Sequence, residues 1–296
     1  MSQVVLITGS STGFGRDTAV QLARRGHHVF ATMRDIRTRN AAARREVEAI
    51  ARAETLKLDV LELDVTSDDS VEQAIESALR HAGHLDVVVN NAGYAGLGVT
   101  EAFTADQFQQ MFDVNVVGVQ RVNRAVLPAM RARKSGLLVH VSSGAGRVVI
   151  PTMTAYCASK FALEALADAY RYELQPFGIN SVIVEPGIYK TPIFDRIAAP
   201  ADRARAEEYG AHDFAARVQG VFQMVSGAPD NPGTLEVVNA LVGLIEMNDA
   251  DRPFRTVVSD AIRPLLEPYN AAAEGLRPIV AQIFNVPELA GPVKGR

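Results

Sequence analysis

Tyr156 and Lys160 are the pair of side chains whose types and spacing best suit acid–base chemistry. They stand four residues apart, so a helix presents both on one face. A free tyrosine has a pKa of about 10, and lowering it by two to three units takes about 3–4 kcal/mol, which a neighbouring cation helps to supply. Tyr156 would then act as general acid in carbonyl reduction and as general base in alcohol oxidation. An isolated Tyr-x-x-x-Lys pair is usually a surface feature, so this interpretation depends on the rest of the chain.

A glycine-rich loop near the N-terminus indicates a bound dinucleotide. The apolar run 4–7 leads into Thr8-Gly9-Ser10-Ser11-Thr12-Gly13-Phe14-Gly15, and a segment of helical periodicity follows. Glycine lets backbone N–H groups approach a phosphate, and the helix N-terminus adds a positive dipole. A tight turn without a ligand would also explain three glycines. The position of the loop after the first strand of a strand–helix series favours the dinucleotide.

The end of the second predicted strand distinguishes NADP from NAD. An NAD site normally has an acidic residue there, which accepts hydrogen bonds from the ribose hydroxyls. This chain reads Thr32-Met33-Arg34-Asp35, and the guanidinium of Arg34 suits the 2′-phosphate of NADP. An ordinary solvated arginine is the alternative, and a shift of one residue would make Asp35 the ribose acceptor. We interpret Asp35 as a cap of the next helix and favour NADP (NADPH) over NAD.

Composition and charge exclude several other classes of protein. The chain has 34 acidic and 30 basic residues and a net charge of −4, which offers no basic field for nucleic acid. Its single cysteine, Cys157, fits a reducing compartment. No secretory leader precedes the first apolar run, and no apolar stretch reaches the ~20 residues of a membrane helix. These features predict a cytoplasmic protein with no nucleic-acid partner and no membrane span.

Other residues with chemical potential are assigned structural roles. His81 and His84 are three residues apart near a helix end, a spacing that could hold zinc, but no further Cys or His lies nearby in the sequence. We therefore predict no metal site. His140 is expected to be packed or hydrogen-bonded, and Cys157 to be a small packing residue.

The predicted elements place the candidate residues on an α/β fold. Apolar runs at 4–7, 28–32, 58–63, 86–90, 137–142 and 180–185 alternate with helical segments at about 14–26, 36–54, 68–82, 104–133 and 156–176. Continuously apolar strands indicate a sheet that is covered on both faces. The alternation predicts a doubly wound parallel sheet in the order 3-2-1-4-5-6-7, with three helices on each face.

The chain beyond residue 189 carries weaker signals. A helix at about 234–248 and a strand at 255–259 are predicted, and the last 35 residues, rich in Pro and Ala, are not placed. No convincing linker or internal repeat is found. We expect one domain over 1–296, with 1–189 as the cofactor and catalytic core and 190–296 as a variable substrate-binding region.

Seven motifs in order make the chain resemble the short-chain dehydrogenase/reductase family over about residues 1–192. They are Thr8-Gly9-x-x-x-Gly13-x-Gly15, Asp64-Val65, Asn90-Asn91-Ala92-Gly93, Asn115, Ser143, Tyr156-Cys157-Ala158-Ser159-Lys160, and Pro186-Gly187 with Thr191. Residues 31–35 and 156–164 further resemble the 17β-hydroxysteroid and retinol dehydrogenase branches. The resemblance implies a Rossmann-type fold and an enzyme that transfers a hydride between NADP(H) and a carbonyl or secondary alcohol.

The resemblance also implies roles for individual residues. Asn115 would hold a water that relays protons to Lys160, Ser143 would polarise the carbonyl, and Ser142 would face away. The implied cofactor contacts are Gly9, Ser11, Thr12, Gly13, Phe14, Gly15, Arg34, Asp64, Val65, Asn91, Ala92, Gly93, Tyr156, Lys160, Pro186, Gly187 and Thr191.

The expected partners are a small apolar substrate and further copies of the chain. Val148, Val149, Ile150, Ile188, Ile193 and Phe194 flank the expected site and suggest an apolar pocket. A homodimer or homotetramer is expected through the long helices 104–133 and 156–176. An NAD-linked alcohol dehydrogenase with the same site and a nucleotide-sensing protein on the same fold are the alternatives.

Overall fold

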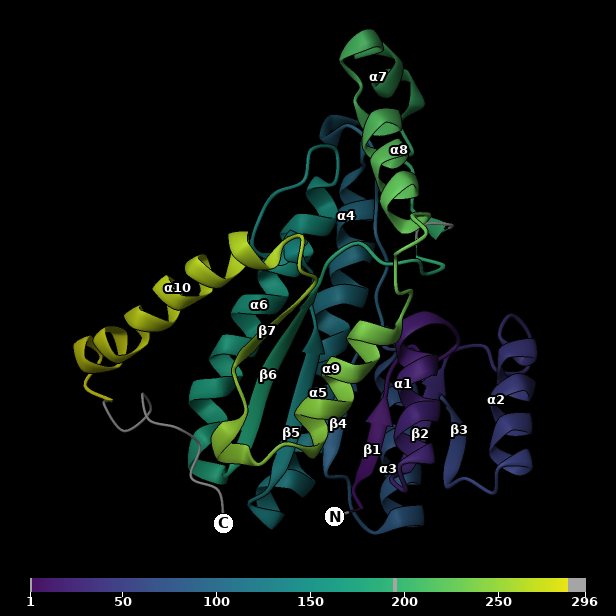
Figure 1. The fold of residues 1–296 in the computed structure, drawn as a ribbon, viewed down its shortest axis with the longest axis vertical. Helices are drawn as coiled ribbons and strands as arrows, with labels where there is room; N and C mark the ends of the chain where they lie inside the picture. The colour runs from purple at the N-terminus through teal and green to yellow at the C-terminus, as the bar shows by residue number, and fades with distance from the viewer. Residues whose placement is uncertain (1, 194–195, 287–296) are drawn as a thin grey trace.

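The computed structural model of the protein describes residues 2–193 and 196–286, and a seven-stranded parallel sheet forms its centre (Figure 1). The strands are β1 (Val4–Ile7), β2 (His28–Met33), β3 (Leu58–Glu62), β4 (Val87–Asn90), β5 (Gly136–Val141), β6 (Ile179–Pro186) and β7 (Arg255–Val258). Their order is β3-β2-β1-β4-β5-β6-β7, and every neighbouring pair is parallel. The predicted fold class is confirmed.

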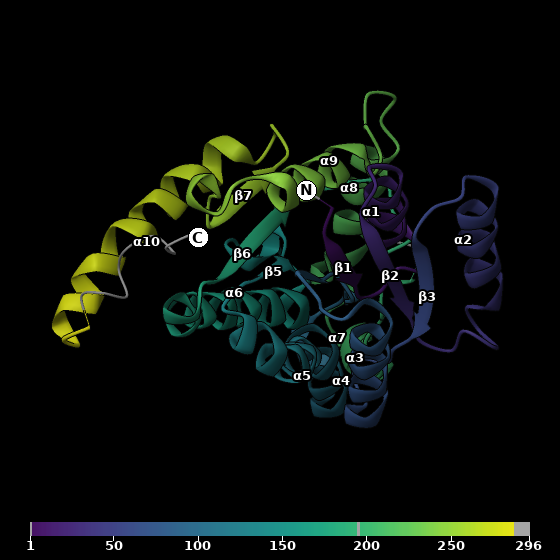
Figure 2. The same cartoon turned by 90° about the horizontal axis from the view of Figure 1, so that it is seen from below.

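Helices cover both faces of the sheet, as Figure 2 shows. One face carries α1 (Gly13–Arg24), α2 (Ala41–Ala53) and α9 (Leu235–Glu246). The other carries α3 (Asp68–Ala82), α5 (Gly118–Arg133) and α6 (Thr154–Leu174). This arrangement brings the carboxyl ends of the strands and the loops that follow them to one edge.

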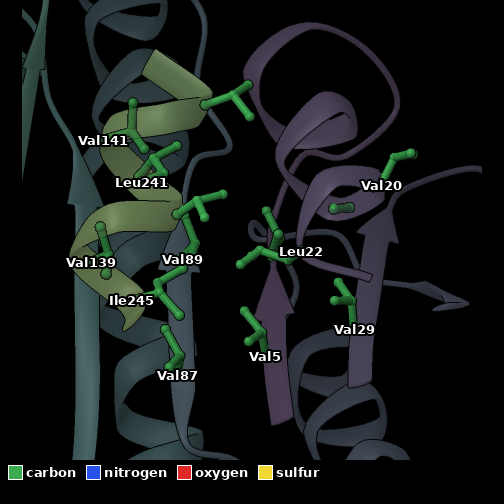
Figure 3. Close-up of a cluster of buried hydrophobic side chains, with 14 of the residues drawn as sticks. Val5, Val20, Leu22, Val29, Val87, Val89, Val139, Val141, Leu241 and Ile245 are labelled. Atoms are coloured by element: carbon green, nitrogen blue, oxygen red, sulfur yellow. The ribbon is translucent and has the colours of Figure 1, made fainter. Parts of the chain in front are cut away.

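The alternation of side chains along each strand explains the two cores. Val5 and Ile7 belong to the first core, in which Val5 lies beside Leu22 of α1 and Leu241 of α9 lies beside Val141 (Figure 3). Their neighbours on β1 belong to the second core, together with Ile75 of α3. Successive side chains of a strand point to opposite faces, so a run such as 4–7 is apolar throughout only when both faces are buried.

The predicted helix 104–133 is interrupted. A capping box of Thr104 and Gln107 starts α4 (Ala105–Phe112), as its sequence indicates. A five-residue π-helix, Asp113–Val117, then separates α4 from α5. Such π-turns insert an extra residue into a helix and occur often at functional sites. Asn115 lies inside this turn.

The interpretation of Asp35 as a helix cap is wrong. Asp35 has a φ of +54°, and its carbonyl accepts hydrogen bonds from the N–H groups of Thr38 and Asn40. The turn built on this left-handed residue occupies the chain up to Asn40, which is the N-terminal capping position of α2. The helix therefore starts five residues later than the predicted position 36.

The chain after residue 196 contains a long helix that was not predicted, α10 (Arg263–Ile283), which lies beside the β7 edge of the sheet. Before it, the chain forms α7 (Arg203–Glu208) and α8 (Ala215–Ser226), followed by α9 and β7. Two prolines inside α10, Pro268 and Pro278, argue against a helix locally because proline lacks the donor N–H. Within residues 2–193 and 196–286 no helix has the length and apolar character needed to cross a membrane.

Candidate active site

A cavity of about 870 Å³ lies where the loops after the parallel strands meet, the usual ligand position in such sheets. Every predicted cofactor residue except Gly15 lines it, and so does Ser143. Asn115 does not line it.

The glycine loop is shaped by close contact with the end of β4. Gly9 has a φ of +70°, and a Cβ on it would lie 2.8 Å from Ala92 Cα. Asn91 Nδ2 donates to the carbonyl oxygens of Thr8 and Gly9 at 2.9 and 3.1 Å. A Cβ on Gly15 would lie 2.4 Å from that same Nδ2. Gly15 therefore faces Asn91 and the Gly9 carbonyl and does not face the cavity, and its contact with Asn91 sets the shape of the loop.

The beginning of α1 fits a phosphate group. Thr12 is its N-terminal capping residue but makes no side-chain hydrogen bond to the helix, and the first turn carries no acidic residue. Gly13, with a φ of +58°, is the first helical residue and lines the cavity. Uncapped N–H groups and the helix dipole at this position suit the pyrophosphate of a nicotinamide dinucleotide.

Two arginines from the chain after β2 also line the cavity. Arg34 lines it with a side chain that is 46% exposed, and Asp35 does not line it, which favours Arg34 as the residue that meets the ribose. Arg39 also lines the cavity and was missed. The sequence placed it on a helix face, whereas the turn built on Asp35 keeps it in the loop before α2.

Tyr156 and Ser143 meet inside the cavity. Tyr156 is 9% exposed, and burial raises the pKa of its phenol to about 12, although a hydrogen bond with Ser143 acts in the opposite direction. Ser143 Oγ also accepts from the N–H of Ala145 at 3.1 Å. Ser142, which was expected to face away, also lines the cavity, although it is buried beside Gly146, and its structural role stays a prediction.

Lys160 is buried on the same face of α6 and is 5% exposed. Its Nζ donates to the carbonyl of Val141 at 2.8 Å and lies 5.8 Å from the centroid of the Tyr156 ring. Burial lowers the pKa of Lys160 to about 8, while the charge of Glu164 acts to raise it. The predicted lysine is therefore beside the tyrosine, but its contact runs to the end of β5.

Asn115 is placed behind the cavity. Its side chain is 1% exposed: Oδ1 accepts from the N–H of Tyr94, and Nδ2 donates to the carbonyl of Tyr94 and to Ser159 Oγ. A Cβ on Gly93 would lie 3.1 Å from Asn115 Oδ1 and 3.8 Å from Lys160 Nζ. Asn115 thus holds the segment after β4 next to the lysine, and its role toward a water stays a prediction.

His140 and Cys157 are packing residues, as expected. Burial, followed by the charge of Lys160, lowers the pKa of His140 to about 3, so it is neutral. Its Nε2 lies 3.2 Å from Ser181 Oγ, and its ring stacks on Tyr170. Cys157 is 1% exposed, and its Sγ accepts from the N–H of Ile150.

The remaining wall of the cavity is largely apolar and combines distant parts of the chain. It includes Phe103, Met111, Val148, Ile150, Ile188, Ile193, Phe222, Ile262, Leu265 and Leu266. Val149, which was predicted to flank the site, is 62% exposed and does not line it, and Phe194 is outside the described residues. Phe222 of α8 and the α10 residues were missed because sequence gives no register for these segments.

A buried polar cluster attaches α10 to the loop after Ser143. Asn270 Nδ2 donates to Glu185 Oε2 at 2.7 Å, and Arg147 Nε donates to Asn270 Oδ1 at 2.9 Å. Burial and the nearby Glu164 raise the pKa of Glu185 to about 7. Because Glu185 precedes Pro186 and Arg147 follows Ser143, this cluster fixes α10 against two edges of the cavity.

The glycine loop, the parallel sheet and the Ser143, Tyr156 and Lys160 side chains in one cavity define a nicotinamide-dependent oxidoreductase. The family model described as short chain dehydrogenase matches residues 3–202, and the chain belongs to this family. It is an NAD(P)-dependent oxidoreductase.

Relatives support the predicted branch. The chain is 37% identical to human 17-beta-hydroxysteroid dehydrogenase type 1 over 234 residues, 77% of this chain and 70% of the relative. It is 39% identical to retinol dehydrogenase 8 of Bos taurus over 188 residues, 62% of this chain and 58% of the relative. The crystal structure of a short-chain dehydrogenase from Streptomyces avermitilis aligns with a TM-score of 0.75 at 26% identity, covering 96% of this chain and 97% of that one.

Proposed function

We propose that the protein is an NADP(H)-dependent reductase and dehydrogenase of apolar ketones and secondary alcohols. The observation that carries this proposal is that Ser143, Tyr156 and Lys160 line the same cavity as two arginines and a largely apolar wall. Two of the relatives are named as a 17-beta-hydroxysteroid dehydrogenase and a retinol dehydrogenase, and hydroxysteroids and retinol are large apolar alcohols. The homo-oligomer and the cytoplasmic location stay predictions.

The polar groups of the chain would divide the reaction between them. The cofactor supplies the hydride, and the glycine loop, Arg34 and Lys160 would hold it. The Ser143 hydroxyl would donate a hydrogen bond to the substrate oxygen, and Tyr156 would give that oxygen its proton in reduction and remove it in oxidation. The apolar wall would exclude water and orient the substrate.

A panel of apolar ketones and alcohols tests this function. Each compound is offered with NADPH, NADH or their oxidised forms, and the absorbance of the reduced nicotinamide is followed. Because the chain has no Trp, cofactor binding can be measured by nicotinamide fluorescence without a tryptophan background. Turnover with no member of the panel, despite cofactor binding, would favour the nucleotide-sensing alternative.

Arg34→Ala should weaken NADPH binding by about 1.5–3 kcal/mol and leave NADH binding almost unchanged, because the guanidinium is proposed to hold only the 2′-phosphate. Dissociation constants of both cofactors for wild type and variant provide the measurement. Arg37→Ala is the matched control, because Arg37 is exposed in the same turn but does not line the cavity. Equal losses for both cofactors would contradict the assignment of Arg34 and support the NAD-linked alternative.

Leu265→Asp should lower kcat/KM for apolar substrates about 5–30-fold, corresponding to the loss of about 1–2 kcal/mol of apolar contact. Leu265 lines the cavity although it is 70% exposed, so the free energy of unfolding should change little. Leu276→Asp is the control, since Leu276 is 58% exposed on the same helix and does not line the cavity. The same kinetic loss in both variants would show that α10 acts at a distance and not as part of the pocket wall.

A further inference from the structure

A cluster of potential metal ligands lies at the opposite end of the sheet from the cavity. His28 begins β2, Asp59 is the second residue of β3, and His81 is in the last turn of α3. We propose that these three side chains bind a divalent transition-metal ion of the Zn²⁺ type. The site is independent of the proposed reaction.

The distances within the cluster are close to those that a metal needs. His28 Nε2 lies 2.8 Å and His81 Nε2 lies 3.8 Å from the same oxygen, Asp59 Oδ2. One ligand atom from each residue lies within 4.8 Å of the others. Tetrahedral zinc with bonds of about 2.0–2.2 Å places its ligand atoms about 3.3 Å apart. The two separations from Asp59 bracket that value: the hydrogen bond between His28 and Asp59 would have to open by about 0.5 Å, and the gap between His81 and Asp59 would have to close by about 0.5 Å.

The surroundings orient both imidazoles and leave the site accessible. Phe30 packs against both rings, with centroids 4.6 Å from His28 and 6.0 Å from His81. The side chains of His28, Asp59 and His81 are 18%, 44% and 64% exposed, so an ion can enter and keep water as a further ligand. His81 also lies at the C-terminal end of α3, where the negative end of the helix dipole favours a cation.

The donor set selects the class of ion. Two imidazoles and one carboxylate suit Zn²⁺, Ni²⁺ or Cu²⁺, whereas Mg²⁺ and Ca²⁺ prefer oxygen ligands. His84, whose spacing from His81 was considered as a zinc pair and set aside, is not part of this cluster: its Nε2 faces Asp86 Oδ2 at 3.2 Å. The fold instead brings in ligands from two neighbouring strands, which no spacing along the helix reveals.

Occupancy of the site would connect α3 to β3, the strand at this edge of the sheet, and to its neighbour β2. An ion that binds only the folded chain stabilises it in proportion to the logarithm of its concentration. None of the three residues lines the cavity, so binding here should raise the melting temperature without contributing to hydride transfer.

The test is a calorimetric titration of the full chain, free of any polyhistidine tag, with Zn²⁺ at about pH 7.5. We expect saturation at one ion per chain and a rise in melting temperature with Zn²⁺. Co²⁺ should give the visible absorption of a low-symmetry site with nitrogen ligands.

Variants distinguish this site from adventitious binding. His81→Ala and Asp59→Asn should each weaken Zn²⁺ binding more than about ten-fold, and His81 is exposed enough for its loss to leave the fold intact. His84→Ala, on the same helix end, should bind like wild type. The proposal is overturned if Zn²⁺ does not saturate a site at micromolar concentrations, or if His81→Ala binds as tightly as wild type.

Discussion

Replacing Tyr156 by phenylalanine should lower turnover by at least about 10²-fold while cofactor affinity stays nearly unchanged. The hydroxyl is the only group removed, and it lies beside Ser143 in the cavity, where the substrate oxygen is proposed to bind. The ring remains, so the packing around this 9%-exposed side chain is preserved. Steady-state kinetics with a ketone substrate and NADPH fluorescence give the two readouts. A variant with more than about a tenth of wild-type turnover would show that another group moves the proton.

The pH dependence of alcohol oxidation provides an independent check of the same group. Burial raises the pKa of Tyr156 to about 12, so within the chain alone the phenolate forms only in strong alkali. The rate of alcohol oxidation should therefore rise with pH. Nearby positive charge favours the phenolate, so it should shift the midpoint of this rise to lower pH. Because Lys160 interacts with Tyr156, the apparent pKa belongs to the pair. Tyr156→Phe should abolish this dependence.

The fold could be predicted from the sequence because its signals are local. Runs such as 4–7 and 87–89 are apolar on both faces of the strand, which is sufficient to indicate a sheet covered on both sides. The glycine loop and the Tyr156–Lys160 pair are likewise short segments whose spacing carries their geometry. These features place the predicted cofactor residues around one cavity.

The parts that could not be predicted depend on contacts between distant residues. The π-turn at Asn115 is stabilised by hydrogen bonds to Tyr94 and Ser159, and α10 is placed by Asn270 and its partner Glu185. Its internal prolines oppose a helix assignment, and only tertiary packing overrides them. The start of α2 was misplaced because the left-handed turn at Asp35 has no sequence signal that distinguishes it from a cap.

Lys160→Met should have opposite effects on function and on stability. We expect turnover to fall by at least about 10²-fold and cofactor binding to weaken by about 1.5–3 kcal/mol, since the ammonium is proposed to hold the cofactor as well as to favour the phenolate. At neutral pH the variant should nevertheless be more stable than wild type by about 1–2 kcal/mol. Kinetics, cofactor titration and denaturant unfolding provide the three measurements.

The gain in stability follows from the burial of a charge. A fall in the pKa of Lys160 from 10.5 to about 8 corresponds to a cost of about 3 kcal/mol for keeping it charged in the fold. Methionine removes that cost but also removes the hydrogen bond to the Val141 carbonyl, worth about 1 kcal/mol.

The pH dependence gives the sign of the effect. Between about pH 8 and 10.5 the unfolded chain binds more protons at Lys160 than the folded chain, so the stability of wild type rises with pH in this interval. The advantage of Lys160→Met should therefore shrink as the pH approaches 10.5. If Lys160 were retained only for packing, the Lys160→Met variant would be less stable than wild type at neutral pH and would keep its turnover. A residue that destabilises the fold and is needed for the reaction is the pattern expected of a functional site.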